Sequence, residues 1–94
     1  MNKREFKCTE ILTDLIENEG LVGIKTSFED EGATFNEVLR LKEICTQANV
    51  KVTLKIGGPE AVRDLKDSMD IGVKGLVAPM VESEFGLKKF IQAT

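Results

Sequence analysis

The chain has 94 residues and a mass of 10.4 kDa, which is enough for one small domain with one hydrophobic core. Hydrophobic residues make up 41% and charged residues 31%, a composition that excludes a disordered or collagen-like chain. No apolar run approaches the roughly 20 residues that cross a bilayer, and no apolar signal segment follows the charged start. We therefore expect a cytoplasmic protein with no membrane partner.

The charge and the missing residue types narrow the chemistry. A formal net charge of −3 and the absence of Trp and Tyr disfavour a nucleic-acid partner. The chain has no histidine, so a general base, metal ligand or nucleophile must come from other groups. Cys8 and Cys45 lack a metal-ligand spacing and fall on apolar faces of predicted helices, which favours two buried free thiols.

The first third of the chain predicts a helix and then a strand. Apolar residues recur at the helical period over 4–19, and Gly20 is suited to end that helix. Residues 21–28 are rich in apolar and β-branched side chains, which predicts a strand. An acidic loop, residues 29–32, follows; its three adjacent carboxylates could bind a divalent cation or simply form a solvated surface.

The middle of the chain predicts a second helix and a second strand. Thr34 and Glu37 stand three positions apart and match a capping box, and the apolar period then continues to a stop at Asn49. Residues 50–56 alternate strictly between apolar and polar side chains. This alternation predicts a strand with one face against the helices.

Two glycines and a proline open the next unit. Gly57 and Gly58 turn the chain, and we expect Pro59 to be the first residue of a third helix that ends near Gly72. Free backbone N–H groups in this turn, at the positive end of a helix, could receive a phosphate or carboxylate, although an ordinary tight turn has the same residues. The inward side chains of this helix are expected to be Ala61, Val62, Leu65 and Met69.

A third strand and a last helix complete the pattern. Residues 74–81 are apolar on both faces, as in a strand of a parallel sheet. Ser83 is suited to cap the last helix. The inward side chains of that helix are expected to be Phe85, Leu87, Phe90 and Ile91.

The order of elements predicts an α/β fold. Strand–loop–helix units begin near residues 21, 50 and 74, a spacing that fits right-handed crossovers and a parallel β-sheet. We expect residues 1–94 to form a single α/β domain, a partial TIM (β/α)₈ barrel with about three βα units and an N-terminal helix. Three parallel strands leave both edges open, so we expect a fragment of a larger barrel or a homo-oligomer.

Alternation within the strands predicts which residues lie on the face away from the helices. On the first two strands these residues are expected to be Gly23, Lys25, Ser27, Lys51, Thr53 and Lys55. On the third strand they are either Ala78, Met80 and Glu82 or the alternate residues, because both faces of that strand are apolar. Lys25, Lys55 and Glu82 stand near the carboxyl ends of their strands, where barrel enzymes assemble their active sites. We therefore expect these three side chains to converge.

Lys25 and Lys55 are the candidate catalytic residues. Two ammonium groups side by side depress each other's pKa, which favours a neutral amine able to form a Schiff base. The alternative is that both lysines reach solvent or pair with Glu29 and Glu82.

Residues 75–83, Gly-Leu-Val-Ala-Pro-Met-Val-Glu-Ser, resemble a strand motif of the HpcH/HpaI aldolase and citrate lyase family. Phe28-Glu29-Asp30 is similar to that family's Leu-Glu-Asp loop. Lys55 lies where its members carry a basic residue, usually arginine. The resemblance covers about residues 21–92.

This resemblance implies a (β/α)₈ barrel and a carbon–carbon lyase that uses Mg²⁺ or Mn²⁺ on a small-molecule oxo-acid or acyl-CoA substrate. It implies that Lys55 polarises the carbonyl of a 2-oxo acid and that Glu82 is the metal-binding glutamate. The family's metal-binding aspartate, and the histidine base that some members use, lie on strands without a counterpart here. An isolated 94-residue chain is therefore expected to be catalytically incomplete.

A second set of residues resembles deoxyribose-phosphate aldolase; it comprises Ile24-Lys25-Thr26-Ser27, Gly32-Ala33-Thr34, Lys55 and Gly57-Gly58. This resemblance implies that Lys25 forms a Schiff base, that Lys55 tunes it, and that the two glycines help to seat a phosphate. A third hypothesis is a noncatalytic module that binds a partner or self-associates through its open sheet edges.

Overall fold

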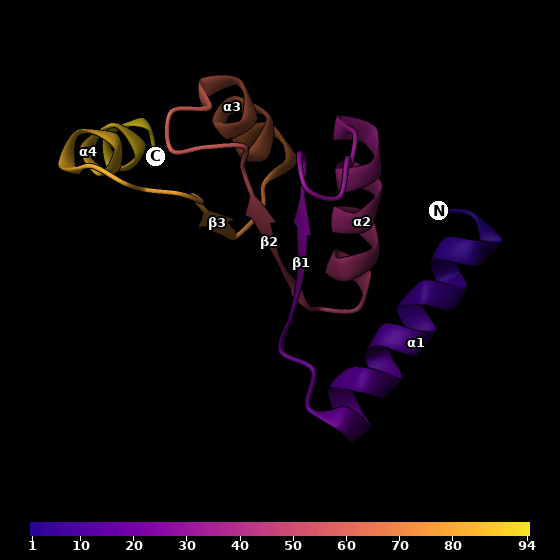
Figure 1. Ribbon diagram of the computed structural model, residues 1–94. Helices are drawn as coiled ribbons and strands as arrows, with labels where there is room; N and C mark the ends of the chain where they lie inside the picture. Colours follow the sequence, from indigo (N-terminus) through magenta and orange to yellow (C-terminus); the bar gives the residue numbers. More distant parts are fainter.

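The computed structural model describes all 94 residues as four helices and a three-stranded sheet (Figure 1). The elements in chain order are α1 (Lys3–Glu19), β1 (Gly23–Ser27), α2 (Phe35–Gln47), β2 (Lys51–Lys55), α3 (Val62–Ile71), β3 (Gly75–Val77) and α4 (Glu84–Ala93). Strands alternate with helices after α1, which confirms the predicted α/β class.

The sheet is parallel and has the order β1-β2-β3. Lys55 at the end of β2 is paired with Ser27 on one side and with Val77 on the other. The parallel pairing predicted from the spacing of the units is confirmed. The two outer strands, β1 and β3, each have one edge without a strand neighbour, so the sheet is open.

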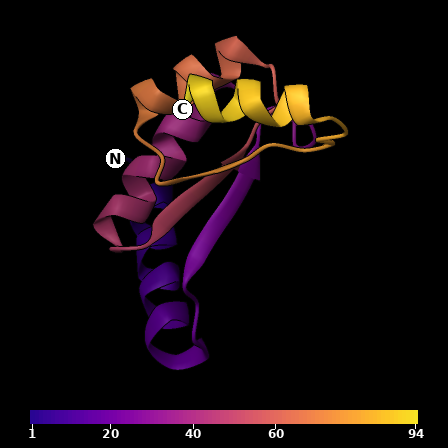
Figure 2. The same cartoon turned by 90° about the vertical axis from the view of Figure 1, so that its left-hand side faces the viewer.

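Helices α2 and α3 pack on one face of the sheet (Figure 2). The centre of the core joins Val38 of α2, Leu54 of β2 and Ile71 of α3. Leu54 has no exposed surface, because the strict alternation of β2 turns it toward both helices. The polar residues of β2 therefore lie on the opposite face, which carries no helix.

Side-chain caps start three of the helices. The predicted capping box of Thr34 and Glu37 is present at α2, where the backbone N–H of Glu37 donates to Thr34 Oγ1 over 3.2 Å. Asn2 and Glu5 form a second, unpredicted capping box at α1. Ser83 caps α4 as predicted, since its side chain accepts a backbone N–H of the first turn. Each cap satisfies amides that the helix leaves without a partner.

Helix α3 starts later than predicted. Pro59 is not its first residue; the helix begins at Val62 and has Ala61 as its N-cap. The backbone N–H of Ala61 donates to the carbonyl oxygen of Gly58 over 3.1 Å, so residues 58–61 form a turn of their own. Proline is well suited to such a turn, because its fixed φ favours the second position of a turn as well as a helix start.

The predicted inward faces of α3 and α4 are buried only in part. On α3, Leu65 is buried, whereas Val62 and Met69 are exposed. On α4 only Phe90 is half-buried, and the remaining predicted inward residues are exposed: Phe85, Leu87 and Ile91. The prediction for these exposed side chains is wrong because no element covers that flank of either helix.

None of the four helices has an apolar stretch long enough to span a bilayer.

The two cysteines lie in different surroundings. Helix α1 packs mainly against α2, contains no buried residue, and lies at the opposite end of the molecule from α4 (Figure 1). Cys8 on α1 is therefore exposed, and its predicted burial is wrong. Cys45 on α2 is fully buried as predicted. Burial raises the pKa of the Cys45 thiol, and the nearby Lys42 charge opposes that rise.

Candidate functional site

A cavity of about 150 Å³ opens at the carboxyl ends of β1 and β2. This is the end of a parallel sheet at which α/β proteins bind their ligands. The cavity is called the carboxyl-end cavity below. It is lined by Ser27, Glu29, Asp30, Lys55, Ile56, Gly57, Pro79 and Met80.

The loop after β1 folds back over the strand ends. The backbone N–H of Phe28 donates to the carbonyl oxygen of Lys55, and that of Ala33 donates to the carbonyl oxygen of Ser27, each over 3.4 Å. These bonds extend the β1–β2 pairing and then return the chain to the start of α2. The acidic residues of the loop are thereby held above the end of β2.

Lys55 and Asp30 form an ion pair at the carboxyl-end cavity. Lys55 Nζ donates a hydrogen bond to Asp30 Oδ2. That bond is the largest contribution both to the raised pKa of Lys55 and to the lowered pKa of Asp30. Lys55 is therefore an ammonium at neutral pH. The predicted depression of the lysine pKa values is wrong for Lys55, because the nearest charge to it is a carboxylate.

Lys25 lies on the same open face of the sheet but does not line the carboxyl-end cavity. It is paired in register with Thr53, two residue pairs before the last pair of β1 and β2, and its side chain is exposed. Lys25 forms no ion pair, although its charge contributes to lowering the pKa of Asp30. The structure thus brings Lys25 and Lys55 to one face and near one carboxylate.

Ser27 lines the carboxyl-end cavity and has a fixed hydroxyl group. Its residue is only 1% exposed, and Ser27 Oγ donates a hydrogen bond to Glu31 Oε2. The backbone N–H of Glu31 in turn donates to Ser27 Oγ over 3.0 Å. The strand and loop patterns do not predict this local turn; the signal for it is a serine at the end of a strand, four residues before an acidic side chain. The carboxylate of Glu31 is therefore engaged within the loop.

The turn at Gly57 and Gly58 already holds a carboxylate. The backbone N–H of Gly57 donates to Asp64 Oδ2 over 2.8 Å. Asp64 stands in the first turn of α3, where a negative charge is favoured by the helix dipole. A Cβ atom at Gly57 would lie 2.6 Å from Glu29 Oε2, so Glu29 also approaches this turn. The predicted anion-binding N–H of Gly57 is thus occupied by a side chain of the protein.

The third strand presents the opposite set of residues from the one predicted. Leu76 pairs with Leu54 and shares its core face, whereas Val77 pairs with Lys55 on the open face. Ala78, Met80 and Glu82 were expected on that open face, and this prediction is wrong by one residue. The cause is that 74–81 is apolar on both faces, so its alternation carries no signal for orientation.

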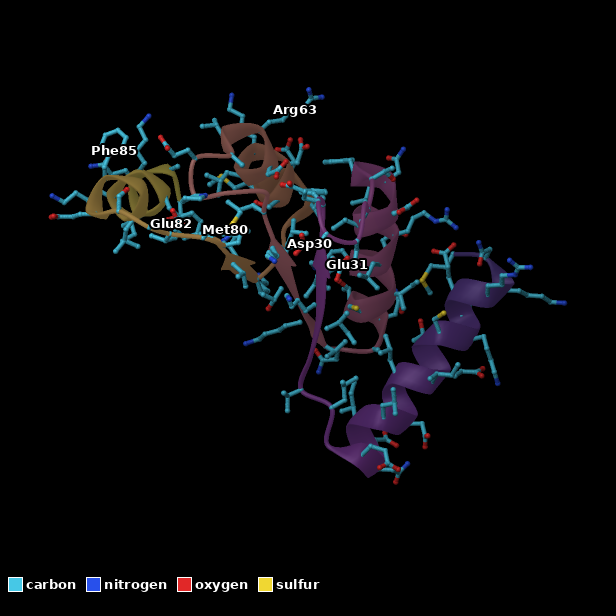
Figure 3. The ribbon with its side chains drawn as sticks, in the orientation of Figure 1. Asp30, Glu31, Arg63, Met80, Glu82 and Phe85 are labelled. Atoms are coloured by element: carbon cyan, nitrogen blue, oxygen red, sulfur yellow. The ribbon has the colours of Figure 1, made fainter.

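Strand β3 ends at Val77, five residues before Glu82. Met80 has a φ of 51°, a left-handed conformation that interrupts an extended chain. Pro79 and Met80 nevertheless reach the carboxyl-end cavity, whereas Glu82 is exposed and lies beside the start of α4 (Figure 3). The expected convergence of Glu82 with the two lysines is therefore not found.

The carboxylates do not assemble a metal centre. No group of three or more Cys, Asp or Glu side chains is placed to hold a metal ion. Mg²⁺ is bound in near-ideal octahedral geometry by one or two carboxylates together with waters, and Glu82 supplies one exposed carboxylate. In the acidic loop, Asp30 is bonded to Lys55 and Glu31 to Ser27. Binding of Mg²⁺ or Mn²⁺ at Glu82 stays a prediction from the family resemblance, and we derive no catalytic step through either ion.

Comparison with known proteins adds no relative. No family model, curated protein or solved structure matches the chain. The resemblances to the HpcH/HpaI family and to deoxyribose-phosphate aldolase therefore stay predictions from their motifs. The chemistry of the carboxyl-end cavity rests on its geometry.

Proposed function

We propose that the chain supplies the carbonyl-binding part of a carbon–carbon lyase of the HpcH/HpaI type, within a (β/α)₈ barrel. The observation that supports this proposal is the protonated Lys55 at the end of a parallel strand, facing a small cavity. Because the family resemblance places a cation at this position, the sequence and the geometry point to the same role. The enzyme acts in the cytoplasm. Its barrel is completed either by other copies of the chain in a homo-oligomer or by further residues of a longer chain.

In this role Lys55 binds the carbonyl oxygen of the substrate. When the carbon–carbon bond breaks, its electron pair moves toward the carbonyl, and negative charge develops on the oxygen. A fixed ammonium lowers the energy of that charge more than that of the neutral carbonyl, which accelerates the reaction. Asp30 must leave the ammonium, or share it, when the substrate binds.

The size of the cavity favours a small oxo acid over an acyl-CoA. Its volume of about 150 Å³ is below the roughly 300 Å³ at which pockets for drug-sized ligands begin. A 2-oxo acid of a few carbons fits such a space, whereas the bulk of an acyl-CoA would lie outside it.

The test is binding of pyruvate, with propionate as the matched carboxylate that lacks the keto oxygen, followed through backbone amide shifts in NMR spectra. We expect pyruvate to shift amides around Ser27, Asp30 and Lys55, and Lys55→Met to weaken its binding at least about tenfold. Lys66→Met is the control, because Lys66 is exposed on α3 and lines no cavity. Equal binding of pyruvate and propionate, or an unaffected Lys55→Met variant, would contradict the proposal.

The Schiff-base alternative is favoured by one observation about Lys25. Lys25 forms no ion pair, whereas Lys55 is held as an ammonium by Asp30. Borohydride reduction in the presence of an aldehyde or oxo acid traps an imine as a stable adduct. An adduct on Lys25, absent in Lys25→Met, would replace the carbonyl-binding role of Lys55 with covalent catalysis.

The noncatalytic alternative is favoured by the uncovered edges and by the exposed apolar residues of α4. Such surfaces promote association between chains. Sedimentation equilibrium distinguishes the cases: an assembly that shows no pyruvate binding supports an interaction module, and a monomer contradicts it.

A further inference from the structure

A second cavity lies at the other end of β2, beside the amino ends of β2 and β3. Its volume is about 250 Å³, and three lysines line it: Lys42 of α2, Lys51 of β2 and Lys74 before β3. Thr46 and Asn49 also line it, and no acidic residue does. In Figure 1 this region lies at the end of β2 that adjoins the last turn of α2, opposite the carboxyl-end cavity.

The three lysines have no acidic partners. None of them takes part in any of the five ion pairs of the molecule, which use Lys7, Arg40, Lys55, Lys88 and Lys89. This is notable in a chain with 16 acidic residues and a net charge of −3. Three positive charges around one concavity repel one another, and an anion bound between them removes that repulsion.

The other side chains of the cavity add neutral hydrogen-bonding groups. Lys42 Nζ donates to Thr46 Oγ1 over 2.9 Å, so the Lys42 ammonium is held at the wall and retains two further N–H donors. Asn49 has a φ of 59°, a conformation that asparagine tolerates better than most residues and that sets the turn from α2 into β2. The cavity thus combines three cations with polar neighbours and contains no competing carboxylate.

We propose that this lysine cavity binds the phosphate group of a small soluble ligand. Lysine binds phosphate as a point charge, and phosphate offers enough oxygen atoms to contact all three ammonium groups. The volume exceeds that of the carboxyl-end cavity, so a ligand with two phosphate groups or a short organic phosphate fits. The site is independent of the proposed lyase chemistry, since it lies at the opposite end of the sheet.

The first experiment is an NMR titration of the whole chain with inorganic phosphate and with inorganic pyrophosphate at low ionic strength. We expect saturable shifts of the amides of Asn49, Lys51 and Lys74. Pyrophosphate, with its higher charge, is expected to bind at least about fivefold more tightly than phosphate, and 0.5 M NaCl to abolish most of the binding. If amides near all the lysines of the chain shift, and the shifts do not saturate as phosphate is added, the anions only accumulate around positive charge and the proposal is overturned.

Single variants locate the site. Lys51→Met and Lys74→Met are each expected to weaken pyrophosphate binding about fivefold or more, because each removes one of three cations. Lys66→Met is the control: it removes the same charge from an exposed helix position that lines no cavity. If Lys66→Met weakens binding as much as the other two variants, net charge explains the effect and the proposal fails.

Two further measurements test whether the lysines stabilise helix ends or bind a lipid surface instead. Lysines near the carboxyl ends of α2 and α3 can also stabilise those helix ends. We expect pyrophosphate to raise the melting temperature of the wild type but not that of the variants. If Lys51→Met and Lys74→Met instead lower the melting temperature equally with and without pyrophosphate, the lysines only stabilise the helix ends and the proposal is overturned. Binding to vesicles that contain phosphatidic acid, without binding to free phosphates, would identify a lipid surface and would also overturn it.

Discussion

The centre of the molecule and its C-terminal end are built from similar amphipathic elements, but they are packed very differently. In the centre, Leu54 is completely covered by α2 and α3. At the C-terminal end, Phe85 is 64% exposed and Ile91 is 60% exposed, although both stand at apolar positions of α4. The comparison shows that an apolar period identifies a face suited to burial, whereas burial itself needs a second element opposite that face.

The contacts of α4 show how little holds that end in place. The buried residue of α4 is Gly86, which lies close to Pro59, and Lys89 forms an ion pair with Glu60 over 3.5 Å. Exposed ion pairs of this kind contribute roughly 0–1 kcal/mol. We therefore expect the centre to determine the stability of the molecule and α4 to contribute little to it.

The largest contrast is expected between the two thiols. At neutral pH, a thiol reagent should modify Cys8 rapidly and leave Cys45 unmodified until the chain unfolds, because Cys45 is buried and its pKa is raised. Mass spectrometry of the labelled protein gives the number of modified thiols and identifies which cysteine carries each label. Two fast-reacting thiols would mean that α2 does not stay packed on the sheet in solution. Cys8→Ser, which leaves only Cys45, is the control.

The next largest effect is expected in the core. Leu54→Ala should lower the free energy of unfolding by about 3–5 kcal/mol, since it removes a fully buried side chain and leaves a cavity. The matched variant Leu87→Ala, on the exposed flank of α4, should change it by less than about 1 kcal/mol. Urea denaturation followed by circular dichroism measures both. A large loss in Leu87→Ala would show that another surface covers α4 in solution.

A smaller effect is expected where β3 joins the sheet. A Cβ atom at Gly75 would lie 2.7 Å from Thr53 Oγ1 and 3.4 Å from Thr53 Cβ, so Gly75→Ala should destabilise the protein by about 1–3 kcal/mol. Gly58→Ala is the control, because a Cβ atom there meets nothing within 4 Å. The double variant Gly75→Ala with Thr53→Ala should recover part of the loss. Absence of any difference between the two glycine variants would count against the β2–β3 register.

The smallest effect concerns the ion pair of Lys55 and Asp30. The lowered pKa of Asp30 means that its stabilising contribution is present above the unfolded pKa of about 3.9 and is lost as the pH falls through the folded value. The raised pKa of Lys55 means that its contribution is present below about 10.4 and is lost as the pH rises through the folded value. Both groups can be titrated by NMR.

The variant Asp30→Asn tests this pair directly. It should return the pKa of Lys55 toward its ordinary value, because the hydrogen bond to Asp30 is the largest cause of the rise. Glu29→Gln is the control, since Glu29 acts on Lys55 only through its charge and should have a smaller effect. An equal effect of the two variants would show that the hydrogen bond is not the main cause.

Local patterns were sufficient for the elements but not for the cavity that joins them. The cap of Thr34 and the alternation of 50–56 predicted α2 and β2 correctly, because both depend on neighbours a few residues away. The predicted start of α3 at Pro59 is three residues too early, since a proline suits either a turn or a first helical turn. The position of Lys55 on the open face was predicted, whereas its carboxylate partner Asp30, 25 residues earlier, was not.

Periodicity, capping residues and unit spacing were enough to establish an α/β chain with parallel strands and Lys55 at a strand end, because these features depend on backbone geometry and short-range sequence. The exposure of Cys8, the orientation of β3 and the separation of Glu82 from the carboxyl-end cavity depended on which elements meet in space. The same is true of the three lysines around the second cavity, which come from different elements. Long-range packing selects among faces that are locally equivalent, so these features could be read only from the folded chain.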